Sequence, residues 1–308
     1  MIGRRSFLGA TAAGVITLLT GCDEGEHPAG SLRIATGGHG GVYFRLGEGL
    51  ARAIREQYPG LRPEVLVTNA SVSNVALVNR GAAEVGFTQA DVLTGAGPAD
   101  PLALARLHDD YLHLVVRADS GLHALGDLRH QRVSLGAAGS GTEISARRLL
   151  DVAGLRPGTD LIDPGLGLDD AVSALATQAV DAFFFSGGLP VAAVAALAAD
   201  VRIRLIGLRR YVPALRRRYG EVYAERNIPT GVYPTAPVVT VAVPNYLVAP
   251  PGLPEPTAYA VTRLLMEEPD LLRAAHPAAD RFNRRNAIVT EPLALHPGAV
   301  RYYRESKP

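Results

Sequence analysis

The stretch ATGGHGGVYFRLGEGLARAI, residues 35–54, joins a glycine-rich turn to an amphipathic segment. Leu46, Leu50 and Ile54 recur at four-residue intervals, which places them on one face of a helix. Residues 32–35, just before the turn, are typical of a short buried strand. A helix that opens in this way presents unpaired N–H groups, and its dipole favours an anion there. The stretch therefore predicts an anion-binding loop, with a purely structural tight turn as the alternative.

A second loop, residues 136–143 (GAAGSGTE), has the same design. Ser140 and Glu143 match a capping box, in which the serine caps the helix and the glutamate reaches back. The spacing from Gly136 to Gly141 also begins a P-loop, but Thr142 stands where the P-loop lysine would follow. Nucleotide hydrolysis is therefore excluded. The loop predicts a helix N-terminus suited to a carboxylate, with a simple capped helix as the alternative.

Composition narrows the possible functions further. The chain has 308 residues, enough for about two domains, and 47% of them are hydrophobic. Lys307 is the only lysine, which argues against Schiff-base enzymes and P-loop nucleotidases. Without residues 1–21 the chain has 29 basic and 30 acidic residues, so we expect neither nucleic acid nor an anionic membrane surface as a partner.

The first residues are typical of an export signal. Arg4 and Arg5 precede an uncharged segment that is too short and too rich in small residues to span a membrane. Residues 19–22 (LTGC) resemble a lipobox, which implies cleavage after residue 21 and a lipid on Cys22, the only cysteine. We expect a signal peptide over 1–21, a linker over 22–30 and attachment to the outer face of the cell membrane. The alternative is a failed anchor that happens to end in a cysteine.

Strand and helix patterns then alternate along the chain. The strand patterns fall at 32–35, 64–68, 84–88, 111–117, 132–136, 181–186, 203–208 and 238–243. The helix patterns fall at 71–81, 142–153, 171–180, 191–199 and 256–266, and Ser71 or Ser73 is the expected N-cap of the first. Such alternation predicts an α/β fold with parallel sheets.

Two long apolar strands, 111–117 and 238–243, divide this pattern into outer and inner segments. The simplest interpretation is two α/β domains that are joined by two crossing strands and separated by a cleft. The expected boundaries are 31–115 plus 240–308 for the first domain and 116–239 for the second.

Signatures of catalysis are missing from the sequence. It contains no G-x-S-x-G, no H-E-x-x-H and no clustered histidines and acids at metal-ligand spacing. We therefore predict no catalytic residue, no metal and no cofactor.

The chain resembles the TRAP-associated extracytoplasmic immunogenic (TAXI) solute receptors. Six motifs appear in family order, at 35–44 (ATGGHGGVYF), 68–74 (TNASVSN), 83–91 (AEVGFTQAD), 136–143 (GAAGSGTE), 181–190 (DAFFFSGGLP) and 228–234 (IPTGVYP). The resemblance implies a two-lobed fold like that of type II periplasmic binding proteins. It also implies a receptor that closes on a small organic anion, glutamate-like or a dicarboxylate, and delivers this ligand to a TRAP permease.

The resemblance also implies a set of ligand contacts. They are Gly38, His39, Gly40, Gly41, Val42, Tyr43, Ser71, Asn74, Gln89, Ser140, Gly141, Thr142 and Phe185. His39 departs from the family pattern, which has a small hydroxyl residue there, so the ligand cannot be copied from relatives. Asp91 is expected to be structural. Two other outputs of the same fold remain open: a sensor that signals to a membrane kinase, and an enzyme.

Overall fold

The computed structural model describes residues 28–93 and 101–307. The predicted signal peptide 1–21 and Cys22, the predicted lipidation site, lie outside the described residues. No helix in the described ranges is both long enough and apolar enough to cross a membrane.

Nine strands form one continuous sheet with the order β2-β1-β3-β9-β4-β6-β5, in which β7 also pairs with β4 and β8 with β9. The strands are β1 (Gly30–Ala35), β2 (Leu61–Leu66), β3 (Val85–Gln89), β4 (Leu102–Arg117), β5 (Val133–Ser134), β6 (Ala182–Gly187), β7 (Ile203–Leu205), β8 (Ala224–Ile228) and β9 (Val238–Ala249). The pairs β1–β2, β1–β3 and β5–β6 are parallel, whereas β4 and β9 run antiparallel to each other and to every strand that pairs with them in the described part of the chain. The predicted mixture of strands and helices is confirmed, but the prediction of parallel sheets is wrong for β4 and β9, which pair only antiparallel at the centre of the sheet.

The helices cover both halves of this sheet. They are α1 (Val42–Gln57), α2 (Ser71–Asn79), α3 (Gly141–Val152), α4 (Leu168–Ala176), α5 (Ala192–Asp200), α6 (Val212–Tyr219), α7 (Glu255–Glu267), α8 (Pro269–Ala275), α9 (Arg284–Ala287) and α10 (Pro297–Glu305). Short 3-10 helices occur at Ala90–Leu93, Leu125–Leu128, Arg209–Tyr211 and Pro277–Arg281.

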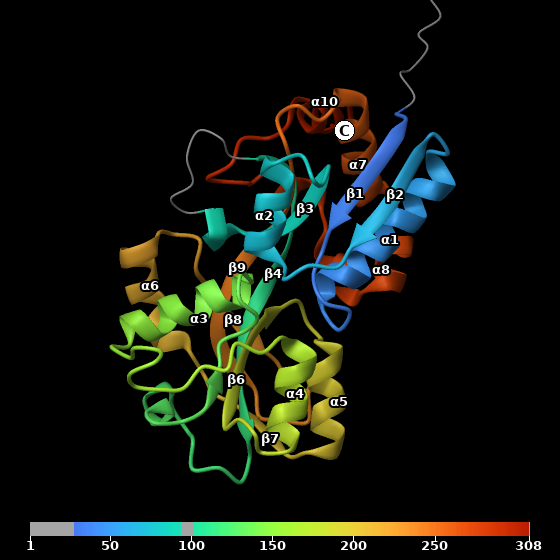
Figure 1. Cartoon of the computed structure of the whole chain (residues 1–308). Helices are drawn as coiled ribbons and strands as arrows, with labels where there is room; N and C mark the ends of the chain where they lie inside the picture. Colours follow the sequence, from blue (N-terminus) through green and yellow to red (C-terminus); the bar gives the residue numbers. More distant parts are fainter. Residues whose placement is uncertain (1–27, 94–100, 308) are drawn as a thin grey trace, which may run out of the picture.

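Two lobes share the strands β4 and β9, which run from one into the other (Figure 1). We call lobe 1 the part with β1, β2, β3, α1, α2, α7, α8 and α10, and lobe 2 the part with β5 to β8 and α3 to α6. In lobe 1, one hydrophobic cluster joins buried residues of β1 and α1 to those of α7, α8 and α10. In lobe 2, α3 and α6 pack on one side of β6, and α4 and α5 pack on the other (Figure 1). The domain boundaries at 115 and 239 stay a prediction.

β4 begins at Leu102, nine residues before the strand expected at 111–117. The sequence hides this part of the strand because Arg106, His108 and the aspartates that follow interrupt the apolar run. Register shifts against β9 fall in this stretch, so the polar side chains reach partners outside the regular ladder.

Candidate ligand-binding site

A cavity of about 210 Å³ lies between the lobes, at the ends of α1 and α3 where the glycine loops stand. It is lined by Gly37, Gly38, Gly40, Gly41, Val42, Tyr43, Thr68, Asn69, Ala70, Ser71, Gln89 and Asp110, and by Gly136, Ala137, Ser140, Gly141, Thr142, Gly167, Leu168, Asp169, Asp170, Phe184, Phe185, Ser186 and Gly187. All of the contacts inferred from the family resemblance line this cavity except His39 and Asn74. Whether they bind a ligand stays a prediction.

The first loop leaves the N-terminus of α1 open. Gly41 is the N-cap residue and no side chain caps the helix. The Gly41 amide donates to the carbonyl oxygen of Gly38 at 2.9 Å, so the loop folds back on itself. The backbone N–H groups of the first helical turn therefore donate no hydrogen bond to a capping side chain. The 16-residue helix directs the positive end of its dipole at the cavity.

The second loop caps α3 with its own side chains. The Ser140 hydroxyl accepts from the Glu143 amide at 3.1 Å, as the sequence predicts. The Glu143 carboxylate, however, accepts from the Gly139 amide at 2.8 Å and not from the amide of Ser140. It reaches one residue further back because Gly139 has a φ of +78°, which turns its N–H toward the helix.

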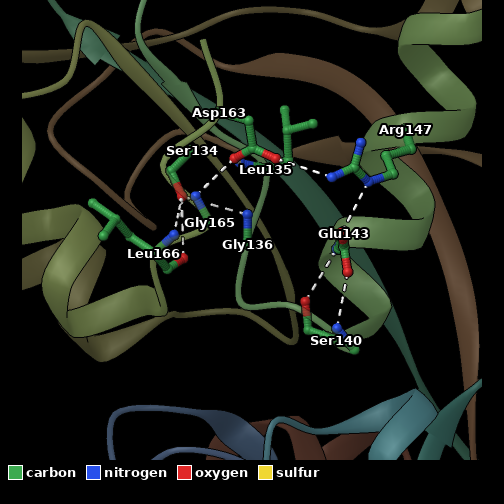
Figure 2. A network of polar contacts seen from close by, with 10 residues as sticks. Ser134, Leu135, Gly136, Ser140, Glu143, Arg147, Asp163, Gly165 and Leu166 are labelled. Atoms are coloured by element: carbon green, nitrogen blue, oxygen red, sulfur yellow. Dashed lines mark hydrogen bonds and ion pairs between the residues drawn. The ribbon is translucent and has the colours of Figure 1, made fainter. Parts of the chain in front are cut away.

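A polar network connects this loop to the start of α4 (Figure 2). Arg147 pairs with Glu143 at 2.9 Å and with Asp163 at 3.1 Å. Asp163 in turn accepts from the Leu135 amide at 3.2 Å, and the Ser134 hydroxyl makes 3.1 Å bonds with both backbone groups of Leu166. The network therefore fixes the N-termini of α3 and α4 relative to each other on the lobe 2 side of the cavity.

A chain of buried polar groups crosses from lobe 1 to lobe 2 beside the cavity. The Gln89 amide nitrogen donates to Asp110 at 3.0 Å and to the Ser186 hydroxyl of β6. Asp110, which is only 2% exposed, also lies 3.1 Å from His108 Nε2. The Ser186 amide donates to Thr142 at 3.1 Å. These bonds orient Gln89 and Thr142 toward the space between the lobes.

Tyr43 occupies the lobe 1 wall and donates a hydrogen bond to Asn245 of β9. Its ring stacks on Phe87 with centroids 5.3 Å apart. Burial, and then the charge of Asp110, raise the pKa of the Tyr43 hydroxyl well above its ordinary value. Tyr43 is therefore a neutral hydrogen-bonding group at any physiological pH.

The backbone of Phe185 contacts a buried histidine, His113. His113 Nδ1 donates to the carbonyl oxygen of Tyr111 at 2.7 Å and lies 3.2 Å from that of Phe185. Its Nε2 accepts from the Tyr233 hydroxyl at 3.1 Å, and this hydroxyl accepts from the Val191 amide at 2.8 Å. Desolvation lowers the pKa of His113 to about 4, so the imidazole is neutral.

Asn74 and His39 serve other purposes than lining the cavity. Asn74 is completely buried, and its amide nitrogen donates to the carbonyl oxygens of Thr36 and Phe87 at 2.6 and 2.8 Å. It therefore ties two strand ends together. His39 is exposed and packs edge-on against Phe44. Its place in a glycine run could not reveal that the side chain points outward.

Helix α2 starts differently from the sequence prediction. Ser71 is its first helical residue, and Ala70 is the N-cap, without a side-chain bond. The Ser71 hydroxyl instead accepts a hydrogen bond from the backbone N–H of Gln89 at 3.2 Å. Both residues lie on the cavity wall. Ser73, the other expected cap, lies within the first turn of the helix.

Three aspartates of the lining, Asp110, Asp169 and Asp170, were missed in the sequence. The last two stand in the first turn of α4, where acids are common because they offset the helix dipole. Asp91, expected to be structural, is buried and accepts from Ser145 at 2.6 Å. Burial raises its pKa, and it does not line the cavity.

The two lobes touch directly around the cavity. The Ser73 amide of α2 donates to the carbonyl oxygen of Gly139 at 3.3 Å. His276 Nδ1 accepts from the Ala278 amide at 3.0 Å, so its Nε2 carries the proton and donates to the carbonyl oxygen of Pro190 at 3.2 Å. The structure is therefore that of lobes closed upon each other. Among the described residues, no three His, Cys, Asp or Glu side chains are placed to hold a metal.

Solved structures with the same fold include a periplasmic binding protein. A protein of Bordetella bronchiseptica RB50 is similar at 16% identity over 89% of this chain and 97% of its own, with a TM-score of 0.56. The periplasmic binding protein BugD is similar at 14% identity over 84% and 88%, with a TM-score of 0.53. A putative L-cystine ABC transporter from Listeria monocytogenes is similar at 12% identity over 83% and 98%, with a TM-score of 0.51. These likenesses confirm the predicted type II periplasmic-binding-protein fold.

The family comparison is broader than the resemblance to TAXI receptors. The sequence model of the NMT1-like family matches residues 34–306, which include both lobes and every residue of the cavity lining. The protein therefore belongs to the NMT1-like family.

Proposed function

We propose that this protein is an extracytoplasmic receptor that binds a small organic acid between its lobes. The observation that carries the proposal is the cavity at the N-termini of two helices, one from each lobe. Each terminus offers backbone N–H groups and a partial positive charge, which together suit a carboxylate.

Binding is coupled to closure of the lobes. A ligand that touches α1 and α3 at once interacts more strongly with the closed arrangement than with an open one, so it shifts the equilibrium toward closure. The movement is a hinge rotation about β4 and β9, the two strands that both lobes share.

The receptor delivers its ligand to a TRAP-type permease and stays at the membrane through a lipid on Cys22. The six family-like motifs at 35–234 support the choice of permease, and the lipobox at 19–22 supports the anchor. Replacement of Cys22 by serine should move the protein from the membrane fraction to the soluble fraction. A C22S protein that stays in the membrane fraction would contradict lipid anchoring.

Ligand binding is tested by thermal melting of the purified protein against amino acids, 2-oxo acids and dicarboxylates. A ligand at 100 times its dissociation constant stabilises the fold by about 2.7 kcal/mol, which raises the melting temperature by about 5 °C. Ala137→Trp fills the cavity without removing a cap, whereas Ala138→Trp changes an exposed neighbour outside the lining. The proposal requires a saturable shift that A137W abolishes and A138W keeps. No shift with any acid would refute it.

A further inference from the structure

The charges that line the cavity are all negative. Asp110, Asp169 and Asp170 contribute carboxylates, and no arginine, lysine or histidine of the described ranges belongs to the lining. The N-termini of α1 and α3 each act as roughly half a positive charge, enough to offset one carboxylate of a ligand. A second carboxylate would find no cation in the lining and would face Asp169 and Asp170, besides Asp110, which already bonds Gln89 and lies beside His108.

Asp169 is directed across the boundary between the lobes. A β-carbon on Gly40 would overlap the Asp169 carboxylate, so this side chain lies directly against the first glycine loop. The side chains of Asp169 and Asp170 make no hydrogen bond or ion pair with another residue in the described part of the chain. Helix-dipole compensation explains why acids stand at the start of α4, but it does not require Asp169 to contact lobe 1.

Gln89 adds a buried acceptor without a donor. Its amide nitrogen faces the Asp110 carboxylate, which can only accept, so the orientation of the amide is fixed by chemistry. The oxygen Oε1 is then left, among the described groups, with no hydrogen-bond donor, and it lies buried against Gly141 of α3. Buried polar groups normally have a partner, so this part of the wall lacks a donor.

We infer that the ligand carries an ammonium group beside Asp169 and Asp110, in addition to a carboxylate at the helix N-termini. This deepens the proposed function and rests on it. An ammonium supplies both a positive charge and N–H donors to the carboxylates of the lining. Val42, Leu168 and Phe185 give the remaining surface an apolar character. The ligand class is therefore a zwitterionic amino acid with a non-acidic side chain, and not a dicarboxylate or a 2-oxo acid.

Isothermal titration of the purified protein with matched acid pairs tests this inference. The pairs are alanine with pyruvate, norvaline with 2-oxopentanoate, leucine with 4-methyl-2-oxopentanoate, and glutamine with glutamate. In the first three pairs the amino group alone is exchanged, and in the fourth a side-chain charge is added. We expect at least one neutral amino acid to bind, about tenfold or more tightly than its 2-oxo partner, and glutamine to bind more tightly than glutamate.

Two variants assign the effect to a residue. Asp169→Asn keeps the shape and removes the charge, and it should weaken binding of the amino acid about tenfold without weakening that of the 2-oxo acid. Asp200→Asn removes an exposed charge outside the lining and should change neither.

Failure of this inference is distinguishable from failure of the proposed function. If a 2-oxo acid or a dicarboxylate binds as tightly as the amino acids, or D169N binds the amino acid as the native protein does, the inference is wrong and the receptor function stands. If none of the acids binds, the proposed function is wrong and the inference falls with it.

Discussion

Gly141, the first residue of α3, lies directly against the side chain of Gln89, the last residue of β3, across the boundary between the lobes. A β-carbon on Gly141 would overlap both the Gln89 amide and the Ser71 hydroxyl. The backbone of Gly141 has no positive φ, so glycine is needed at this position for space and not for backbone conformation. The absence of a side chain is therefore a condition for closure.

Gly141→Ala should impair closure and leave each lobe folded. Alanine suits a helical position, so α3 itself has no reason to lose stability. The overlap arises only when lobe 2 meets lobe 1, so the variant should bind ligand at least tenfold more weakly, a cost of about 1.4 kcal/mol or more. Calorimetry measures the affinity, and small-angle scattering shows whether added ligand still compacts the variant.

Gly126→Ala is the matched control because a β-carbon there has no neighbour within 4 Å. It should bind and compact as the native protein does. Native affinity in G141A would show that the lobes do not need this contact.

Asn74→Ala should destabilise the protein even without ligand. The change removes the hydrogen bonds that the Asn74 amide donates to the buried carbonyl oxygens of Thr36 and Phe87, at a cost of about 1–3 kcal/mol. Urea unfolding measures the loss. Asn69→Ala alters an exposed residue of the cavity lining and should keep the stability of the apo protein. Equal stability of the two variants would show that the hydrogen bonds of Asn74 do not stabilise the fold.

Acid should destabilise the fold through His113. Its pKa is lowered from 6.5 to about 4 in the fold, so the unfolded chain binds more protons between these values. The contribution of this histidine is complete above pH 6.5 and is lost as the pH falls to 4, by about 3 kcal/mol in total. Urea unfolding at several pH values measures the slope.

His113→Gln should flatten that slope, because an amide keeps a donor and an acceptor and does not titrate. The comparison is needed because burial also lowers the pKa of His276 and His296, which adds acid sensitivity of the same sign. His123→Gln changes an exposed histidine and should keep the native slope. If H113Q and the native protein lose stability in parallel, the titration belongs to other groups.

Ser134→Ala should loosen the start of α4. The hydroxyl is buried and bonds both backbone groups of Leu166, so its loss should cost about 1–3 kcal/mol. Because α4 carries Asp169, ligand affinity should fall together with stability. Ser173→Ala, on an exposed face of the same helix, should change neither. An unchanged affinity in S134A would show that the network in Figure 2 does not position the site.

Local sequence patterns predicted most helices and strands well, but they predicted contacts between distant parts of the chain poorly. The periodic face of α1 is buried at Leu46, Leu50 and Ile54 as expected, and Gly154 ends the region of α3 with a φ of +69°. The first half of β4 was missed because Asp109 and Asp110 are polar, and only the folded protein supplies the partners Arg226 and Gln89 that compensate for them.

The sequence predicted those parts of the candidate site that lie in the two glycine-rich loops. Both glycine loops line the cavity, since glycine runs before a helix are a local signal. Asp169 gave no such signal, because the sequence GLDD at 167–170 describes the start of any helix. Its approach to Gly40 depends on how two lobes meet, which no spacing along the chain records.

The hydrophobic cluster of lobe 1 has a consequence for the order in which the chain acquires structure. It combines residues between Leu32 and Leu107 with residues between Leu247 and Tyr303, whereas the cluster around α4 and α5 needs only residues 115–233. On the ribosome, the first strands must therefore wait for the last helices, with their apolar faces uncovered while the middle of the chain is made. The α4 and α5 side of lobe 2 can form during synthesis, whereas the cluster around α3 and α6 also needs β9 and Leu293, and lobe 1 forms only when α10 arrives. The chain therefore cannot complete the core of lobe 1 until its last helices have been made.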